Sequence, residues 1–148
     1  MKAVIQRVLS ASVSIKGKQI SYINQGLLIL LGVENKDDAS DLDYLVKKTA
    51  GLRIFKDKDD NMNLSIQDVG GEVLVVNQFT LCADIKRGRR PSFIHAAPPL
   101  VADSIYQKYC EKLRANNILV KTGKFGAMME VKLINDGPVT ILLNSNER

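Results

Sequence analysis

The run of residues 73–84 constrains the fold of this chain more than any other stretch. It follows Gly70 and Gly71, begins with four apolar residues, and becomes partly polar from Asn77 onward. An apolar run of this kind, rich in valine, is typical of a strand that is buried on both faces of a sheet. A buried strand holds the residues at its end in fixed positions, which suits functional groups. We therefore expect a site where this strand ends.

Residues 135–140 are expected to be the partner of this site. Their sequence contains Gly137-Pro138, the strongest turn signal in the chain, and predicts a tight turn between two strands. A trans bond before Pro138 is the ordinary form, because only about 5–6% of such bonds in folded proteins are cis. A cis bond would let the carbonyl oxygens of Gly137 and Pro138 point the same way, as paired acceptors for an ammonium group. The residues alone leave both forms open.

Composition is that of an ordinary single-domain protein. The 148 residues suffice for one domain, residues 1–148, with a core of its own. No apolar run approaches the ~20 residues of a membrane span, and the N-terminus lacks the long apolar segment of a signal peptide. We expect a soluble, cytoplasmic protein that binds no membrane.

Few residues are suited to metal chemistry. The two cysteines, Cys82 and Cys110, lack the spacing of metal ligands, and His95 is the only histidine. A zinc site or a catalytic triad built on histidine is therefore disfavoured. We expect no metal and no other cofactor.

The periodicity of the chain predicts an α+β fold, with a mostly antiparallel sheet or barrel and two main helices. The first helix is expected at residues 38–50, with Ser40 and Asp43 in capping-box register, and the second from Pro98 to about Asn116. Besides the strand that begins at residue 73, apolar patterns predict strands at residues 1–8, 12–15, 19–23, 26–33, 52–55, 118–122, 129–133 and 139–143.

Positive charge gathers directly after the run of residues 73–84. The net charge is +5, and Lys86, Arg87, Arg89 and Arg90 lie within five residues, just before Pro91. Such a cluster fits a site for an anionic partner. It equally fits an ordinary solvent-exposed loop.

Thr80 is the candidate nucleophile at the expected strand end, but threonine is weak unless a base activates it. No histidine, lysine pair or N-terminal amine is placed by the local sequence to do so. Backbone N–H groups around Phe79 and Thr80 could instead stabilise an oxyanion without proton transfer by a side chain. A third interpretation is that Gln78 and Thr80 only satisfy a sheet edge.

Two segments closely resemble the signature motifs of the D-aminoacyl-tRNA deacylases, also called D-tyrosyl-tRNA deacylases. They are residues 76–81, Val-Asn-Gln-Phe-Thr-Leu, and residues 135–140, Asn-Asp-Gly-Pro-Val-Thr. The resemblance covers nearly the whole chain, since five further segments match in order and spacing: residues 3–8, 26–33, 52–55, 90–93 and 125–128. One departure is Asn77, where the family usually has serine.

The resemblance implies a homodimeric, metal-free esterase that hydrolyses the ester between a D-amino acid and the terminal adenosine of tRNA. It implies that a cis Gly137-Pro138 enters the partner subunit's pocket, captures the substrate's α-amino group and excludes L side chains. Glycyl-tRNA would then also be a substrate, because glycine has no side chain to exclude. Catalysis would rest on the tRNA's own 2′-hydroxyl and on backbone groups.

The same resemblance implies the roles of individual residues. Gln78, Phe79 and Thr80 would form the catalytic segment that contacts the adenosine, and the further substrate-binding positions would be Asn77, Met129 and Asn135. The basic residues 86–90 would hold the tRNA backbone. The rival hypothesis is a non-catalytic RNA- or DNA-binding module that uses the same basic residues and cleaves no ester.

Overall fold

Strand β1 (Lys2–Ile15) is the centre of the structure because it pairs with three other strands. The computed structural model describes all residues, 1–148. The three partners of β1 are all antiparallel to it, namely β2 (Lys18–Ile23), β3 (Gly26–Gly32) and β8 (Glu130–Asn144). The predicted strands at residues 1–8 and 12–15 are thus one continuous strand.

The other half of the main sheet is parallel. Strand β6 (Glu72–Asn77) lies beside β3, and β7 (Leu119–Thr122) lies beside β6. Helix α1 (Ala39–Gly51) lies in the connection from β3 to β6, and helix α2 (Pro99–Ala115) in the connection from β6 to β7. The predicted α+β class with two main helices is confirmed. The sheet is more mixed than expected, because each helical crossover returns the chain in the same direction.

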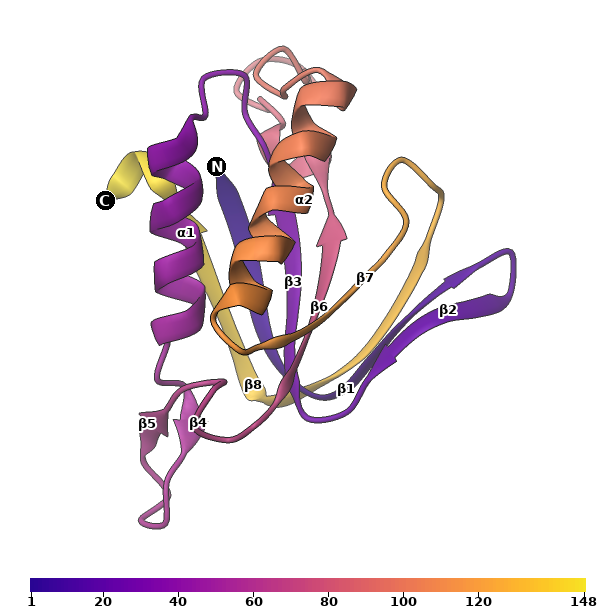
Figure 1. Cartoon of the computed structure of the whole chain (residues 1–148). Coiled ribbons are helices and arrows are strands. Elements are labelled where there is room, and N and C mark those ends of the chain that lie inside the picture. Colours follow the sequence, from indigo (N-terminus) through magenta and orange to yellow (C-terminus); the bar gives the residue numbers. More distant parts are fainter.

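A small hairpin of β4 (Phe55–Lys56) and β5 (Met62–Leu64) projects from the body, and short 3-10 helices occur at Phe79–Cys82 and Ser145–Glu147 (Figure 1). The predicted strand at residues 52–55 is shifted accordingly, because only Phe55 and Lys56 pair with β5. None of the helices combines the length and the hydrophobicity that a membrane span requires.

Both helices begin at residues that favour helix initiation. Asp38, not Ser40, caps α1: its carboxylate accepts hydrogen bonds from the N–H groups of Ser40 and Asp41, and the Asp41 carboxylate accepts from the N–H of Asp38 at 3.0 Å. The predicted register of the capping box was therefore wrong by two residues. Helix α2 begins at Pro99, whose missing N–H costs nothing in the first turn.

Strand β6 is buried on both faces, as the run of residues 73–84 predicts. Val73 and Val75 belong to the large core between the sheet and the two helices, which lie on the same face of the sheet (Figure 1). Leu74 and Val76 belong to a smaller core on the opposite face. Both cores fix the position of Asn77, the last residue of β6.

Residues 135–140 do not form the predicted turn between two strands. They lie within the single strand β8, whose two halves both pair antiparallel with β1. The register shifts there, so that the whole segment from Asn135 to Thr140 lies opposite only Gln6 to Val8 of β1. The segment is therefore a bulge, and the chain continues in its original direction past it.

Candidate functional site

The chain turns sharply at the end of β6. The N–H of Gln78 donates to the carbonyl oxygen of Leu31 at 2.7 Å, which extends the pairing of β6 with β3 by one residue. The 3-10 helix Phe79–Cys82 follows at once. Phe79 is 53% exposed, an unusual state for a large apolar side chain next to a buried strand. The predicted strand end is thus present, and it presents an aromatic ring to solvent.

A cavity of about 440 Å³ lies beside this ring. The rings of Phe79 and Phe93 meet edge to face with centroids 4.9 Å apart, and Phe125 contributes a third aromatic wall. The remaining lining residues come from the N-terminal end of α2 and its flanks: Asn77, Ala96, Ala97, Pro98, Pro99, Ala102 and Gly126. A flat apolar ring is the kind of ligand that such walls favour.

No base forms a hydrogen bond with the Thr80 hydroxyl. This hydroxyl accepts a hydrogen bond from the side-chain amide of Gln78, and an amide does not remove protons. Phe79 and Thr80 are the first residues of a short helix, so their N–H groups have no partner within it. The local geometry therefore favours backbone donors over a threonine nucleophile.

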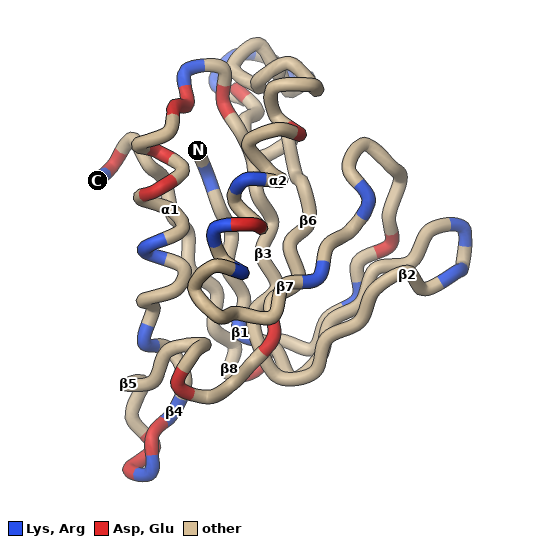
Figure 2. Tube along the Cα trace, viewed as in Figure 1, with Lys and Arg blue, Asp and Glu red and all other residues tan.

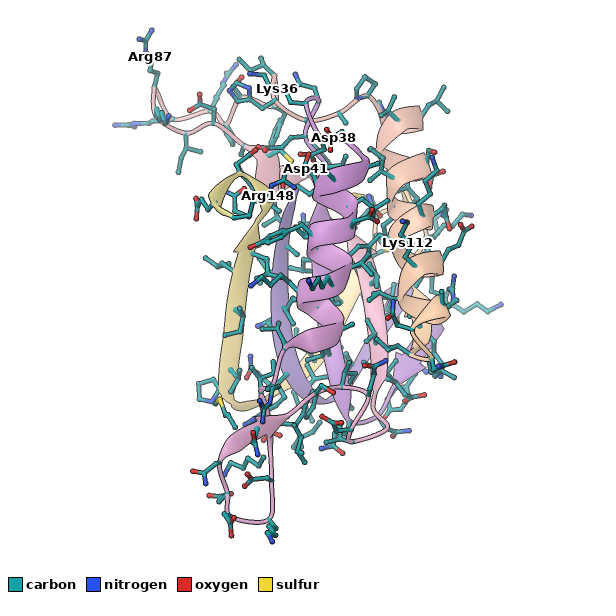
Figure 3. All side chains as sticks on the ribbon, turned by 60° about the vertical axis from the view of Figure 1, so that its left-hand side comes forward. Lys36, Asp38, Asp41, Arg87, Lys112 and Arg148 are labelled. Atoms are coloured by element: carbon teal, nitrogen blue, oxygen red, sulfur yellow. The ribbon has the colours of Figure 1, made fainter.

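The basic residues 86–90 form an exposed loop near this cavity. Paired backbone hydrogen bonds between Asp84 and Ser92, at 2.7 and 2.9 Å, close its base. None of its four cations forms an ion pair within the chain. Arg87 points away from the body of the protein (Figure 3). Other cations are spread over the surface, including the tip of the β1–β2 hairpin (Figure 2).

The bulge of β8 presents Gly137 and Pro138 to solvent. The bond between them is cis, and Gly137 has a φ of +143°. A Cβ on Gly137 would come within 2.7 Å of Val139 Cγ2 and 3.0 Å of the Val139 nitrogen. Only glycine therefore fits this position.

Two side chains hold the bulge in place. The carboxamide of Asn135 accepts from the N–H of Val139 at 2.7 Å and donates to Thr140 Oγ1 at 3.1 Å. The guanidinium of Arg7, 3% exposed, donates to the backbone oxygens of Ile54 and Asp136. Asn135 thus braces its own segment from within.

Arg7 was missed by the sequence analysis, although a signal was present. Residues 1–8 alternate between buried and less buried positions, and Arg7 falls in the buried series with Ala3 and Ile5. A charged side chain on the inward face of a strand needs internal acceptors. Such a residue was therefore a candidate for bracing another segment.

The two predicted segments do not meet within one chain. The first residue of β3, Gly26, pairs with Val8, which pairs with Asn135, whereas Leu31 near its other end pairs with Asn77. At about 3.3 Å per residue, these two ends of β3 are roughly 16 Å apart. Figure 1 agrees, since β8 bends at the end of the sheet away from the start of α2. Within one chain, residues 135–140 and Phe79 therefore lie at opposite ends of the sheet.

Met129, the last of the predicted positions, does not line the aromatic cavity. It packs against the smaller core, and its sulfur accepts from the N–H of Lys124 at 3.4 Å.

The two cysteines are not placed for chemistry at neutral pH. Burial raises the pKa of both thiols, Cys82 and Cys110, to about 11, so neither ionises readily there. No group of three or more His, Cys, Asp or Glu side chains is arranged to hold a metal ion.

Comparisons with known proteins match nearly the full length of this chain to a single family. The family model described as D-Tyr-tRNA(Tyr) deacylase matches residues 4–144. The D-aminoacyl-tRNA deacylase of Desulfatibacillum aliphaticivorans is 52% identical, over 98% of this chain and 99% of the relative. That of Clostridioides difficile is 51% identical, over 99% of both chains.

Two solved structures share the fold. The structure of the c-Myc DNA Unwinding Element Binding Protein is 42% identical, with a TM-score of 0.92, and covers 97% of this chain and 98% of that one. A probable eukaryotic D-amino acid tRNA deacylase is 16% identical, with a TM-score of 0.79, and covers 96% of this chain and 97% of that one.

Proposed function

The chain belongs to the D-Tyr-tRNA(Tyr) deacylase family, and on that premise we propose that it hydrolyses the ester between a D-amino acid and the terminal adenosine of tRNA. The products are free D-amino acid and reusable tRNA. Relatives about 50% identical over the full length, all named D-aminoacyl-tRNA deacylases, support this activity. Charged tRNA is used in translation, so we expect the protein to act in the cytoplasm.

The aromatic cavity takes the adenine of the terminal adenosine. Bases stack on aromatic side chains, and each such contact stabilises a complex by about 1–3 kcal/mol. Phe79, Phe93 and Phe125 offer three aromatic surfaces around a volume of about 440 Å³. An adenine held there brings its ribose, and the ester on it, to the edge of the cavity beside Gln78 and Thr80.

Hydrolysis proceeds by attack of water on the ester carbonyl carbon. The N–H groups of Phe79 and Thr80 stabilise the oxyanion that forms. When the intermediate collapses, the bond between the carbonyl carbon and the ribose oxygen breaks, and the ribose oxygen takes up the proton that the attacking water gives up. The neighbouring 2′-hydroxyl of the tRNA, not a protein side chain, assists this proton transfer. The Thr80 hydroxyl supports this assignment, because its one side-chain hydrogen-bond partner is the Gln78 amide, which is not a base.

The separation of the two segments is the observation that carries the proposal of a dimer. Gly137-Pro138 and Phe79 lie at opposite ends of the sheet in one chain, so they can form one site only between two copies. In a twofold dimer each copy gives its bulge to the other and receives the other's bulge in return. The enzyme is therefore a homodimer with two shared sites.

Selection between enantiomers falls to the bulge. The backbone oxygens of Gly137 and Pro138 accept the substrate's α-amino group, and the backbone beside them leaves no room for an L side chain. Glycyl-tRNA passes the same test because glycine has no side chain. The hydrogen bonds from Arg7 and Asn135 that hold this segment support the role. An L side chain is excluded only if the backbone at Gly137 and Pro138 cannot move aside to admit it.

The basic residues 86–90 hold the tRNA backbone. Their loop is exposed and is followed closely in the chain by Phe93, which lines the cavity. None of its four cations forms an ion pair within the chain, so their charge is available to phosphates. The affinity that these phosphate contacts add does not depend on the tRNA sequence and falls as the salt concentration rises.

A non-catalytic nucleic-acid-binding module is the second candidate function. It is favoured by the likeness to the c-Myc DNA Unwinding Element Binding Protein, a protein named for binding DNA. This module would use the same basic loop and would show salt-dependent binding without cleavage of any ester.

A deacylation assay separates the two functions. D-tyrosyl-tRNA and L-tyrosyl-tRNA are incubated side by side with the purified protein, with and without a chelator. We expect release of D-tyrosine, little release of L-tyrosine, and no effect of the chelator. Binding of tRNA without hydrolysis of either ester would refute the enzymatic function and favour the binding module.

A further inference from the structure

Asn77 is the only polar side chain that lines the aromatic cavity. The other nine lining residues are phenylalanine, alanine, proline and glycine. Any hydrogen bond that a side chain in this lining offers to a bound ring must therefore come from the Asn77 carboxamide. A cavity that is otherwise apolar gives such a single polar group a large effect on which ligand binds.

The backbone position of Asn77 is well defined. Asn77 is the last residue of β6 and pairs with Leu31 of β3, and the next N–H, that of Gln78, is still bonded to the sheet. The Cα of Asn77 is thus held from both sides, and only the two side-chain torsions remain free.

The carboxamide is not satisfied by the protein itself. Its Oδ1 lies buried under the cavity wall without any hydrogen-bond donor. Buried acceptors are normally paired, and one that is not invites a functional explanation. With Oδ1 buried, only one polar atom of the carboxamide faces the cavity at a time. A half-turn about the Cβ–Cγ bond brings the oxygen to the cavity and the nitrogen under the wall, so the group can present either a donor or an acceptor.

We propose that Asn77 reads the polar edge of the base in this cavity and thereby selects adenine. Asparagine carboxamides are suited to the 6-amino edge of adenine. With its oxygen turned to the cavity, Asn77 accepts one hydrogen bond from the 6-amino group. Phe79, Phe93 and Phe125 bind the faces and edges of any base, whereas Asn77 distinguishes one base from another. The inference rests on the proposed function, in which the cavity holds the terminal adenosine.

The test compares two nucleotides that differ only at the edge that Asn77 would read. Adenosine monophosphate carries the 6-amino group, and purine riboside monophosphate has hydrogen in its place. Their dissociation constants are measured by calorimetry for the wild type, Asn77→Leu and Asn77→Ser. Asn61→Ser, in the β4–β5 hairpin, is the control, and thermal unfolding checks that each variant folds. Phe79→Ala shows whether binding depends on the cavity.

We expect the wild type and Asn61→Ser to prefer adenosine monophosphate by about tenfold, the effect of one good hydrogen bond. Asn77→Leu, which keeps the size of the side chain, should reduce that preference to within about twofold, as should the smaller Asn77→Ser. If binding depends on Phe79 but the Asn77 variants keep the full preference, the inference is wrong and the proposed function stands. If neither nucleotide binds in a manner that depends on Phe79, both the inference and the assignment of the cavity are overturned.

Discussion

The guanidinium of Arg7 donates to the backbone oxygen of Asp136, with 2.9 Å between Nε and that oxygen. This bond ties the central strand β1 to the residue directly before Gly137. A second bond, from Nη1 of Arg7 to the carbonyl oxygen of Ile54, fixes the other side of the guanidinium. The bulge that carries Gly137 and Pro138 is thus anchored in the core of the same chain.

Replacement of Arg7 by lysine should be far from conservative. One ammonium group cannot reproduce the planar fork that reaches both carbonyl oxygens, so at least one buried acceptor loses its donor. We expect the free energy of unfolding to fall by about 1–3 kcal/mol, measured by urea denaturation, together with a lower ratio of D- to L-tyrosyl-tRNA hydrolysis.

Arg114→Lys is the matched control for this change. Arg114 is exposed and donates to a single carbonyl oxygen, that of Val120, away from the bulge. It should cost less stability and leave the D-to-L ratio unchanged. If Arg7→Lys kept the wild-type ratio despite its loss of stability, Arg7 would be a structural residue only.

Substitution of Gly137 by alanine should distort the backbone of the bulge itself, whereas Arg7→Lys removes a contact from outside it. The added Cβ meets Val139 within 3.0 Å, and the φ of +143° disfavours any residue with a side chain. Strain of this kind costs about 1–3 kcal/mol. We expect a dimer that cleaves D-tyrosyl-tRNA more slowly and discriminates less, as kinetic assays on both esters would measure.

Gly17→Ala supplies the comparison. Gly17 also has a positive φ, +77°, but no atom lies within 4 Å of the Cβ position. The strain at the β1–β2 turn should lower stability without any change in selectivity. Equal loss of selectivity in both variants would mean that Gly137 acts through general stability.

Thr80→Val tests the absence of a side-chain nucleophile. Valine keeps the shape of threonine and removes the hydroxyl that Gln78 contacts, while the backbone N–H groups remain. We expect the rate of D-tyrosyl-tRNA hydrolysis to fall by less than about tenfold, the effect of one lost hydrogen bond. Complete loss of turnover, or an acyl group trapped on Thr80, would show that the hydroxyl is the nucleophile.

Neutralising Arg87, Arg89 and Arg90 together should weaken tRNA binding and flatten its dependence on salt. Each phosphate contact contributes about 0.7–0.9 to the slope of log affinity against log salt concentration. The control replaces Lys16, Lys18 and Lys58, exposed cations on the two hairpins. If the two triple variants gave the same slope, the loop would be an ordinary part of the solvent-exposed surface.

Some of this structure follows from local sequence. The apolar residues of β6 predicted a strand buried on both faces, and Pro98-Pro99 predicted the start of α2, because burial and helix initiation depend on neighbouring residues. The parallel pairing of β3 with β6 was not predicted, because the apolar pattern of a strand does not state the direction of its partner. The aromatic cavity was not predicted either, since Phe79, Phe93 and Phe125 are far apart in the chain.

The bulge at Gly137 shows a second reason why the local sequence does not predict the whole structure. Asn-Asp-Gly-Pro is a strong turn signal, yet β8 continues beyond it in the same direction. Pairing of both halves of β8 with β1, and the bonds from Arg7 and Asn135, override the local preference. Local turn chemistry does not include such distant contacts.

In the proposed dimer each site is shared between two copies of the chain, and mixed dimers test this sharing most directly. Phe79→Ala disables one component of the site and Gly137→Ala the other, so each homodimer alone has only damaged sites. Co-expressed with different affinity tags, the two chains form mixed dimers in which one site receives Phe79 from one subunit and Gly137 from its partner. Its second site carries both substitutions.

Hydrolysis of D-tyrosyl-tRNA by the purified mixed dimer, relative to the wild type and to each homodimer, is the decisive measurement. If the site is shared, the mixed dimer should recover about half of the wild-type rate, because one of its two sites is intact, and it should again reject L-tyrosyl-tRNA. If Phe79 and Gly137 served the same site within one chain, the mixed dimer would do no better than the average of the two homodimers, which would contradict the account.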